Sequence, residues 1–153
     1  MIETIRPANT DDAPVVAKMV GALLTELRGL ETMVDLAPLE DTARTLLDGT
    51  HGYWAWLALD DSGAPAAVLT LNECASVYAG GHFGEICELY VRPDQRSTDV
   101  GRRLLDQATA FGRQRSWSQL EVGAPSLPRW ARTVAFYKNN GFVEVGPRLN
   151  FKL

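Results

Sequence analysis

The residues best suited to chemistry lie in one continuous stretch, from Glu85 to Leu105. An apolar-rich segment, Glu85–Val91, has the composition of a strand, and a helix is predicted to open at Val100. The loop between them, Arg92–Asp99, is short and polar. Such a loop leaves backbone N–H groups free at the helix start, where the helix dipole favours an anion. The stretch therefore predicts a phosphate site, although the Ser, Thr and Asp of the loop also suit ordinary helix caps.

A second motif lies near the C-terminus, where Ala135–Phe142 is predicted to end a helix on Gly141. Together the two stretches resemble the acyl-CoA-binding core of the GNAT N-acetyltransferase superfamily. In that family a strand ending in Leu-Tyr-Val precedes an Arg-x-x-Gly-x-Gly/Ala loop and a later Phe-Tyr-x-x-x-Gly-Phe helix end. The residues that carry the resemblance are Leu89, Tyr90, Val91, Arg96, Val100, Gly101, Phe136, Tyr137, Gly141 and Phe142.

The elements that must position these residues follow from hydrophobic spacing and turn signals. Strands are predicted at Ile2–Ile5, Tyr53–Leu59, Ala66–Leu71, Glu85–Val91 and Trp117–Val122, with a closing hairpin of Phe142–Val145 and Leu149–Leu153. Helices are predicted from Thr10 or Asp11, at Pro38–Asp48, from Val100 and at Arg129–Asn140, and a loop at Tyr78–Gly84. We expect an α+β fold of the GNAT type. Its mixed, mostly antiparallel sheet would have about six to seven strands with a splayed parallel pair, flanked by about four helices.

Length and charge bound the class of protein. The 153 residues predict a single domain over 1–153. A net charge of −4 argues against a nucleic-acid partner, which would require a basic face. Cys74 and Cys87 lack disulfide or metal spacing, so we expect no metal. Because the sequence has neither a basic-then-apolar leader nor a long apolar run, we expect a cytoplasmic protein without a membrane partner.

The resemblance implies where the acyl donor binds. Leu89, Tyr90 and Val91 would offer strand backbone to the pantetheine arm, and the run Arg96, Ser97, Thr98, Asp99, Val100, Gly101 and Arg102 would surround the pyrophosphate. Ser97 and Asp99 stand where the family usually has glycine, which allows close approach of backbone to phosphate. Two hypotheses remain open. Acetyl-CoA binds with help from hydroxyls and from Arg103, or the donor is an acyl carrier protein that meets the cluster Arg92, Arg96, Arg102 and Arg103.

The resemblance also implies catalytic roles. Tyr137 would give a proton to the departing thiolate. The carboxylate of Glu88, or alternatively of Glu85, would take a proton from the attacking amine, although some family members use no base. Strand alternation puts these two glutamates on opposite faces unless a bulge intervenes.

The implied reaction is transfer of an acetyl or other short acyl group to a primary amine of a small molecule. A cationic acceptor would suit Glu26, Glu31 and Asp35, or those residues form a solvated face. The rival class is a non-catalytic module that binds an acyl-CoA or another ligand. A homodimer is compatible with the resemblance, since related proteins often pair through their C-terminal strands.

Overall fold

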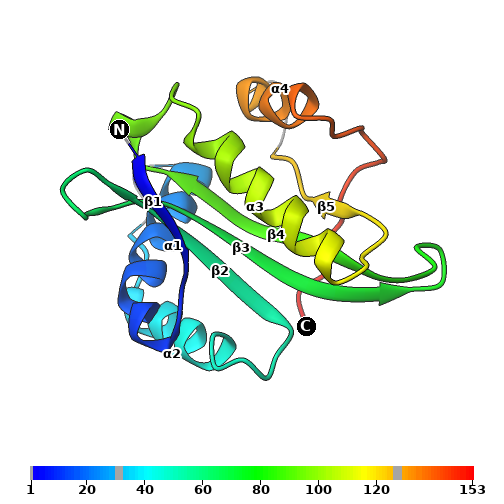
Figure 1. Cartoon of the computed structure of the whole chain (residues 1–153), viewed down its shortest axis with the longest axis horizontal. Helices are drawn as coiled ribbons and strands as arrows, with labels where there is room; N and C mark the ends of the chain where they lie inside the picture. The colour runs from blue at the N-terminus through cyan, green and yellow to red at the C-terminus, as the bar shows by residue number, and fades with distance from the viewer. Residues whose placement is uncertain (1, 30–32, 126–128) are drawn as a thin grey trace. The chain divides into compact units, whose positions relative to one another are not determined.

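The computed structural model describes residues 2–29, 33–125 and 129–153 (Figure 1). Its sheet has the strand order β1-β2-β3-β4-β5. The strands are β1 (Ile2–Pro7), β2 (Tyr53–Asp60), β3 (Pro65–Ser76), β4 (Gly81–Val91) and β5 (Leu120–Val122). The first four are antiparallel, and β5 follows a helical crossover and lies parallel to β4.

In the described part of the chain, four α-helices accompany the sheet: α1 (Ala13–Arg28), α2 (Leu36–Leu46), α3 (Val100–Gln114) and α4 (Ala131–Asn139). The 3-10 turns η1 (Thr10–Asp12) and η2 (Pro93–Gln95) precede α1 and α3. The chain divides into two compact units, one reaching Glu121 and the other covering Val122–Leu153. Among the described helices, none combines the length and the apolar composition that crossing a bilayer requires.

The capping box before α1 belongs to the 3-10 turn η1, and its cap lies one residue earlier than expected. Asn9, rather than Thr10 or Asp11, accepts a hydrogen bond from the Asp11 N–H at 2.9 Å, and the Asp12 carboxylate accepts one from the Asn9 N–H at 2.9 Å. Pro14 then occupies the first turn, where its missing N–H costs nothing. α1 packs against those residues of β2 and β3 that point to its side of the sheet.

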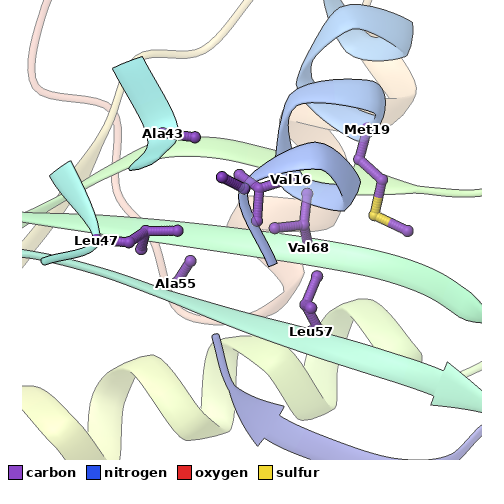
Figure 2. Packing of buried hydrophobic residues seen from close by; sticks show 8 residues of the cluster. Val16, Met19, Ala43, Leu47, Ala55, Leu57 and Val68 are labelled. Carbon is purple, nitrogen blue, oxygen red and sulfur yellow. The ribbon is translucent and has the colours of Figure 1, made fainter. Parts of the chain in front are cut away.

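Helices α1 and α2 cover one face of the sheet and α3 covers the other. Val16 and Met19 of α1, Ala43 of α2 and Leu47 at the C-cap of α2 pack on Ala55, Leu57 and Val68 (Figure 2). The intervening residues of β2 point the other way, because successive strand residues alternate. There the rings of Trp54 and Trp56 lie 4.9 and 5.0 Å from Phe111 of α3.

The predicted closing hairpin is wrong: Phe142–Leu153 contains no strand, so the sheet has five strands rather than six or seven. Its alternating apolar side chains are instead exposed, namely Val143, Val145, Leu149, Phe151 and Leu153. Alternation alone does not make a strand. Two segments of four and five residues form a marginal hairpin unless they pair with a further strand, and Pro147 cannot donate to a ladder.

The β3–β4 hairpin is longer than its sequence signals. β3 continues to Ser76 and β4 begins at Gly81, so most of the predicted loop Tyr78–Gly84 is strand. Ser76 pairs with Gly81 and Ala75 with His82. Cross-strand pairing here outweighs the weak strand preference of glycine.

Candidate functional site

A β-bulge in β4 brings the two candidate carboxylates to the same face of the sheet. Glu88 pairs with Thr70 and Glu85 with Asn72, which leaves Cys87 as the extra residue between them. Thr70 and Asn72 are two residues apart on β3 and therefore share a face. Because Ala55, which packs against α1 and α2, pairs with Thr70, both glutamates lie on the α1/α2 face.

Glu88 is held by two neutral hydroxyls. The Tyr53 hydroxyl donates to Glu88 Oε2 at 2.9 Å, and the Thr70 hydroxyl donates to the same oxygen. The Glu88 N–H in turn donates to Thr70 Oγ1 at 3.0 Å. Burial, and then the negative charge of Glu88, raise the pKa of Tyr53 far above its ordinary value, so this tyrosine remains a neutral donor. Within the described residues no hydrogen bond reaches the other carboxylate oxygen, Oε1.

Beside Glu88 lies a cavity of about 60 Å³ between α1, α2 and the sheet. Its walls are mostly apolar side chains of the two helices, among them Val16, Val20, Leu39 and Leu46. Thr42 of α2 also lines the cavity, and Tyr53 and Glu88 line it from the sheet. The half-buried carboxylate therefore faces a small, partly open and largely apolar space.

The segment predicted to bind pantetheine lies at the end of β4. Leu89, Tyr90 and Val91 pair with β3 on one side. On the other side β5 meets the start of β4: the Gly84 N–H donates to the Gln119 carbonyl at 3.0 Å. Parallel strands advance residue for residue, so β5, ending at Val122, stops short of Leu89. This arrangement leaves an edge of the Leu89–Val91 backbone that β5 does not pair.

The loop after β4 has the backbone shape that its glycine-containing counterparts would favour. Ser97 has φ of +66°, in the left-handed region where glycine is preferred. The Thr98 hydroxyl donates to the Gln95 carbonyl at 2.6 Å. Asp99 occupies the N-cap position of α3 without a side-chain cap bond and pairs instead with Arg102 at 3.1 Å. The loop thus contains one non-glycine residue with a positive φ, and an ion pair between Asp99 and Arg102 lies at the start of α3.

Arg96 is tied to α1. Its guanidinium donates to Glu26 Oε1 at 2.6 Å and to the Val91 carbonyl at 2.8 Å, and it lies 5.5 Å from the centre of the Tyr90 ring. Glu26 was predicted to attract a cationic acceptor, but its carboxylate is engaged by this arginine. Of the other two acids in that prediction, Asp35 accepts from the Ala37 N–H at the start of α2, and Glu31 lies outside the described residues.

The other three arginines of the predicted cluster have partners as well. Arg92 pairs with Asp60 at 2.8 Å and Asp94 at 2.6 Å, Arg102 with Asp99 and Asp106 at 3.1 Å each, and Arg103 donates to the Ile2 carbonyl at 3.0 Å. An incoming phosphate or acidic protein would have to displace these partners. The Arg102 pairs are exposed and individually weak, so their exchange costs little, whereas Arg92 is paired with the buried Asp60.

Tyr137 belongs to the second unit, in α4. Its side chain is only 8% exposed, with the rings of Phe136 and Phe142 at 5.3 and 5.4 Å. Burial raises the pKa of Tyr137 to about 12, so its hydroxyl carries a proton at neutral pH. The helix ends at Asn139, and Gly141 has φ of +94°, which explains the glycine at this position of the motif.

The sequence did not signal the roles of Tyr53 and Thr70. Both were read as parts of strands, and only the register that aligns Thr70 with Glu88 brings their hydroxyls to its carboxylate. A tyrosine at the start of a predicted strand was the one available signal. Within the described ranges no group of three or more His, Cys, Asp or Glu side chains could hold a metal ion.

Comparison with known proteins gives one family and many similar folds. Residues 51–144 match the family model described as acetyltransferase (GNAT) domain. No curated protein matches the sequence significantly. A GCN5-related N-acetyltransferase from Ralstonia eutropha JMP134 has a TM-score of 0.80 at 22% identity, over 99% of each chain.

Two other solved structures show what similar folds bind or modify. A predicted acetyltransferase from Clostridium acetobutylicum, crystallised with acetyl-CoA, has a TM-score of 0.80 at 18% identity, over 99% of this chain and 96% of that one. Ribosomal-protein-alanine N-acetyltransferase from Brucella melitensis biovar Abortus 2308 has a TM-score of 0.74 at 20% identity, over 100% and 99%. At these identities the likeness shows the fold alone.

Proposed function

This chain belongs to the GNAT acetyltransferase family, and we propose that it moves an acetyl or other short acyl group from acyl-CoA to a primary amine of a small molecule. The observation that carries the proposal is the carboxylate of Glu88, which faces a small, mostly apolar cavity and is oriented by two hydroxyls. A carboxylate held in this way suits an amine that must lose a proton before it attacks a thioester.

Glu88 is the proposed base. It would take a proton from the acceptor ammonium, directly or through a water molecule, while Tyr53 and Thr70 hold its carboxylate in one orientation. Glu85 is the alternative base, because the bulge at Cys87 puts it on the same face as Glu88. Glu88 is preferred since it lines the cavity.

Tyr137 is the proposed acid. Its hydroxyl would protonate the thiolate that leaves when the acyl group transfers, which requires a tyrosine that is neutral at the working pH. With a pKa of about 12, the hydroxyl carries this proton at neutral pH, as the role requires.

The proposed donor site is Leu89–Val91 together with the loop from Arg96 to Arg102. The strand edge that β5 leaves unpaired suits the amides of pantetheine, and the positive φ of Ser97 suits a loop that turns around pyrophosphate. The carrier-protein alternative stays open, because an acidic partner would have to displace the same internal partners of these arginines as a CoA pyrophosphate would.

The test is calorimetric titration of the purified protein with acetyl-CoA, free CoA and S-acetylpantetheine, followed by thiol-release assays with a panel of amines. We expect micromolar binding of both CoA species, at least tenfold tighter than the pantetheine, because only CoA carries the pyrophosphate. Equal affinities would favour a carrier-protein donor. Absence of acetyl-CoA binding would overturn the proposal, and binding without transfer to any amine would favour a non-catalytic module.

A further inference from the structure

We propose that the acceptor is an unbranched aliphatic primary amine of about four to six non-hydrogen atoms, bound as its ammonium ion with the nitrogen at Glu88 Oε1. The cavity beside Glu88 would hold its carbon chain. That this amine is the acyl acceptor rests on the proposed function, whereas its binding beside Glu88 does not. This inference narrows the acceptor from any small amine to one with a single charge and a short alkyl chain.

The charge of the acceptor follows from the charges around the cavity. Of the described residues that line it, Glu88 alone carries a charge. A carboxylate facing an apolar space is costly unless it is paired and hydrogen bonded. Tyr53 and Thr70 satisfy Oε2, so Oε1 is the atom positioned to receive an ammonium group.

The shape and polarity of the acceptor follow from the walls. Val20, Leu39 and Leu46 present hydrocarbon, so each methylene that enters the cavity should strengthen binding about fourfold. A volume of about 60 Å³ admits roughly four to six water-sized groups. A second ionised group on the acceptor, such as an α-carboxylate, would enter this space without a cation to pair with among the lining residues, and it should therefore be excluded.

The test measures amine binding without any acyl donor, by protein NMR titration with n-alkylammonium chlorides from ethyl to hexyl. We expect affinity to rise about fourfold per methylene and then to stop rising near butyl or pentyl, where the cavity is full. The matched probe 4-aminobutyrate, which adds a carboxylate to the butyl chain, should bind at least tenfold more weakly. Glu88→Gln should weaken n-butylammonium at least tenfold.

Two threonines of α2 provide a matched pair of variants. Thr42 lines the cavity and Thr45 does not, yet each is exposed and donates its hydroxyl to the carbonyl four residues earlier, at 2.9 and 3.0 Å. Thr42→Leu should weaken n-butylammonium severalfold and ethylammonium less, because the larger side chain fills part of the cavity. Thr45→Leu should bind both amines like the unmodified protein.

The outcomes separate this inference from the proposed function. Equal binding of n-butylammonium and 4-aminobutyrate, or equal effects of Thr42→Leu and Thr45→Leu, would overturn the inference. Acetyl transfer to a bulky or zwitterionic amine, without alkylammonium binding, would overturn it while leaving the proposed function intact. Alkylammonium binding that depends on Glu88, in a protein that transfers nothing, would support the inference and overturn the proposed function.

Discussion

The cavity beside Glu88 and the loop before α3 differ in whether their charged side chains are paired with opposite charges of the same chain. In the cavity, one carboxylate is held by neutral hydroxyls and faces apolar walls. In and around the loop, Arg96 and Arg102 are paired with carboxylates of this same chain. The cavity therefore presents an uncompensated charge to a ligand, whereas the loop must exchange partners to bind one.

The difference in burial decides what each region controls. The Arg102 side chain is 54% exposed and Asp99 60%, and exposed ion pairs contribute about 0–1 kcal/mol. Changes in the loop should therefore alter donor affinity by small factors. Glu88 is half-buried and oriented, so a change there should alter the chemical step by much more.

Glu88→Gln is expected to have the largest effect. The amide keeps the shape but cannot accept the proton of the ammonium, so kcat should fall about 10³-fold, while acetyl-CoA affinity stays the same. Steady-state kinetics and donor titration measure the two quantities. The matched variant is Glu85→Gln on the same face of β4, for which kcat should change only a few-fold. A large fall in kcat for Glu85→Gln and a small one for Glu88→Gln would identify Glu85 as the base. The contrast drawn between the Glu88 cavity and the loop before α3 would then fail.

Tyr137→Phe should lower kcat about 10²-fold, because the departing thiolate loses its proton donor. Acetyl-CoA should bind with unchanged affinity, which separates the chemical step from the loop. Since the pKa of Tyr137 is raised to about 12, its hydroxyl stays protonated at neutral and mildly alkaline pH, so turnover of the unmodified protein should show no loss from this group until the pH approaches that value. Unchanged kcat in the variant would remove the role.

Local patterns in the sequence predicted the elements that carry these residues. The strand, loop and helix from Glu85 to Gln114 could be predicted because apolar spacing and polar turn residues are local signals. The register of β4 against β3 could not be predicted from local patterns, because the bulge at Cys87 is a property of the pairing of the two strands. The ion pair of Glu26 with Arg96 joins residues 70 positions apart, so no spacing rule could reveal that this acid is occupied.

At the C-terminal residues the sequence predicted an element that the structure does not contain. Alternation in Phe142–Leu153 resembled a hairpin, yet a ladder needs a partner, which a short apolar pattern does not specify. The predicted homodimer and the single domain over the whole chain stay predictions. What the sequence predicted well are elements with their own periodicity, whereas the bulge, the ion pairs and the hydroxyls around Glu88 depend on tertiary pairing.

Asp99→Asn tests whether the loop weakens its own donor site. Removing this charge from the start of α3 releases Arg102 from one of its two ion pairs and should strengthen CoA binding roughly fivefold, with kcat unchanged. Asp106→Asn is the matched control, because Asp106 also pairs with Arg102 at 3.1 Å but lies two turns into the helix. It should change CoA affinity less than twofold. Equal gains from the two variants would mean that freeing Arg102, rather than removing charge at the helix start, is what matters.

Tyr53→Phe should have the smallest effect and would show how rigidly the cavity holds its carboxylate. Tyr53 is a positioning residue: its hydroxyl bonds Glu88 and leaves the proton transfer to that carboxylate. With Thr70 still bonded to the same oxygen, kcat should fall only about twofold, in line with the lower range of net hydrogen-bond energies. Tyr78→Phe is the control, since its hydroxyl bonds Glu121 and not Glu88. A loss of stability to denaturant with unchanged kcat would make Tyr53 structural only. If kcat of Tyr53→Phe fell as far as kcat of Glu88→Gln, Tyr53 and Glu88 would act as a unit. The Thr70 hydroxyl alone would then not keep the carboxylate in place.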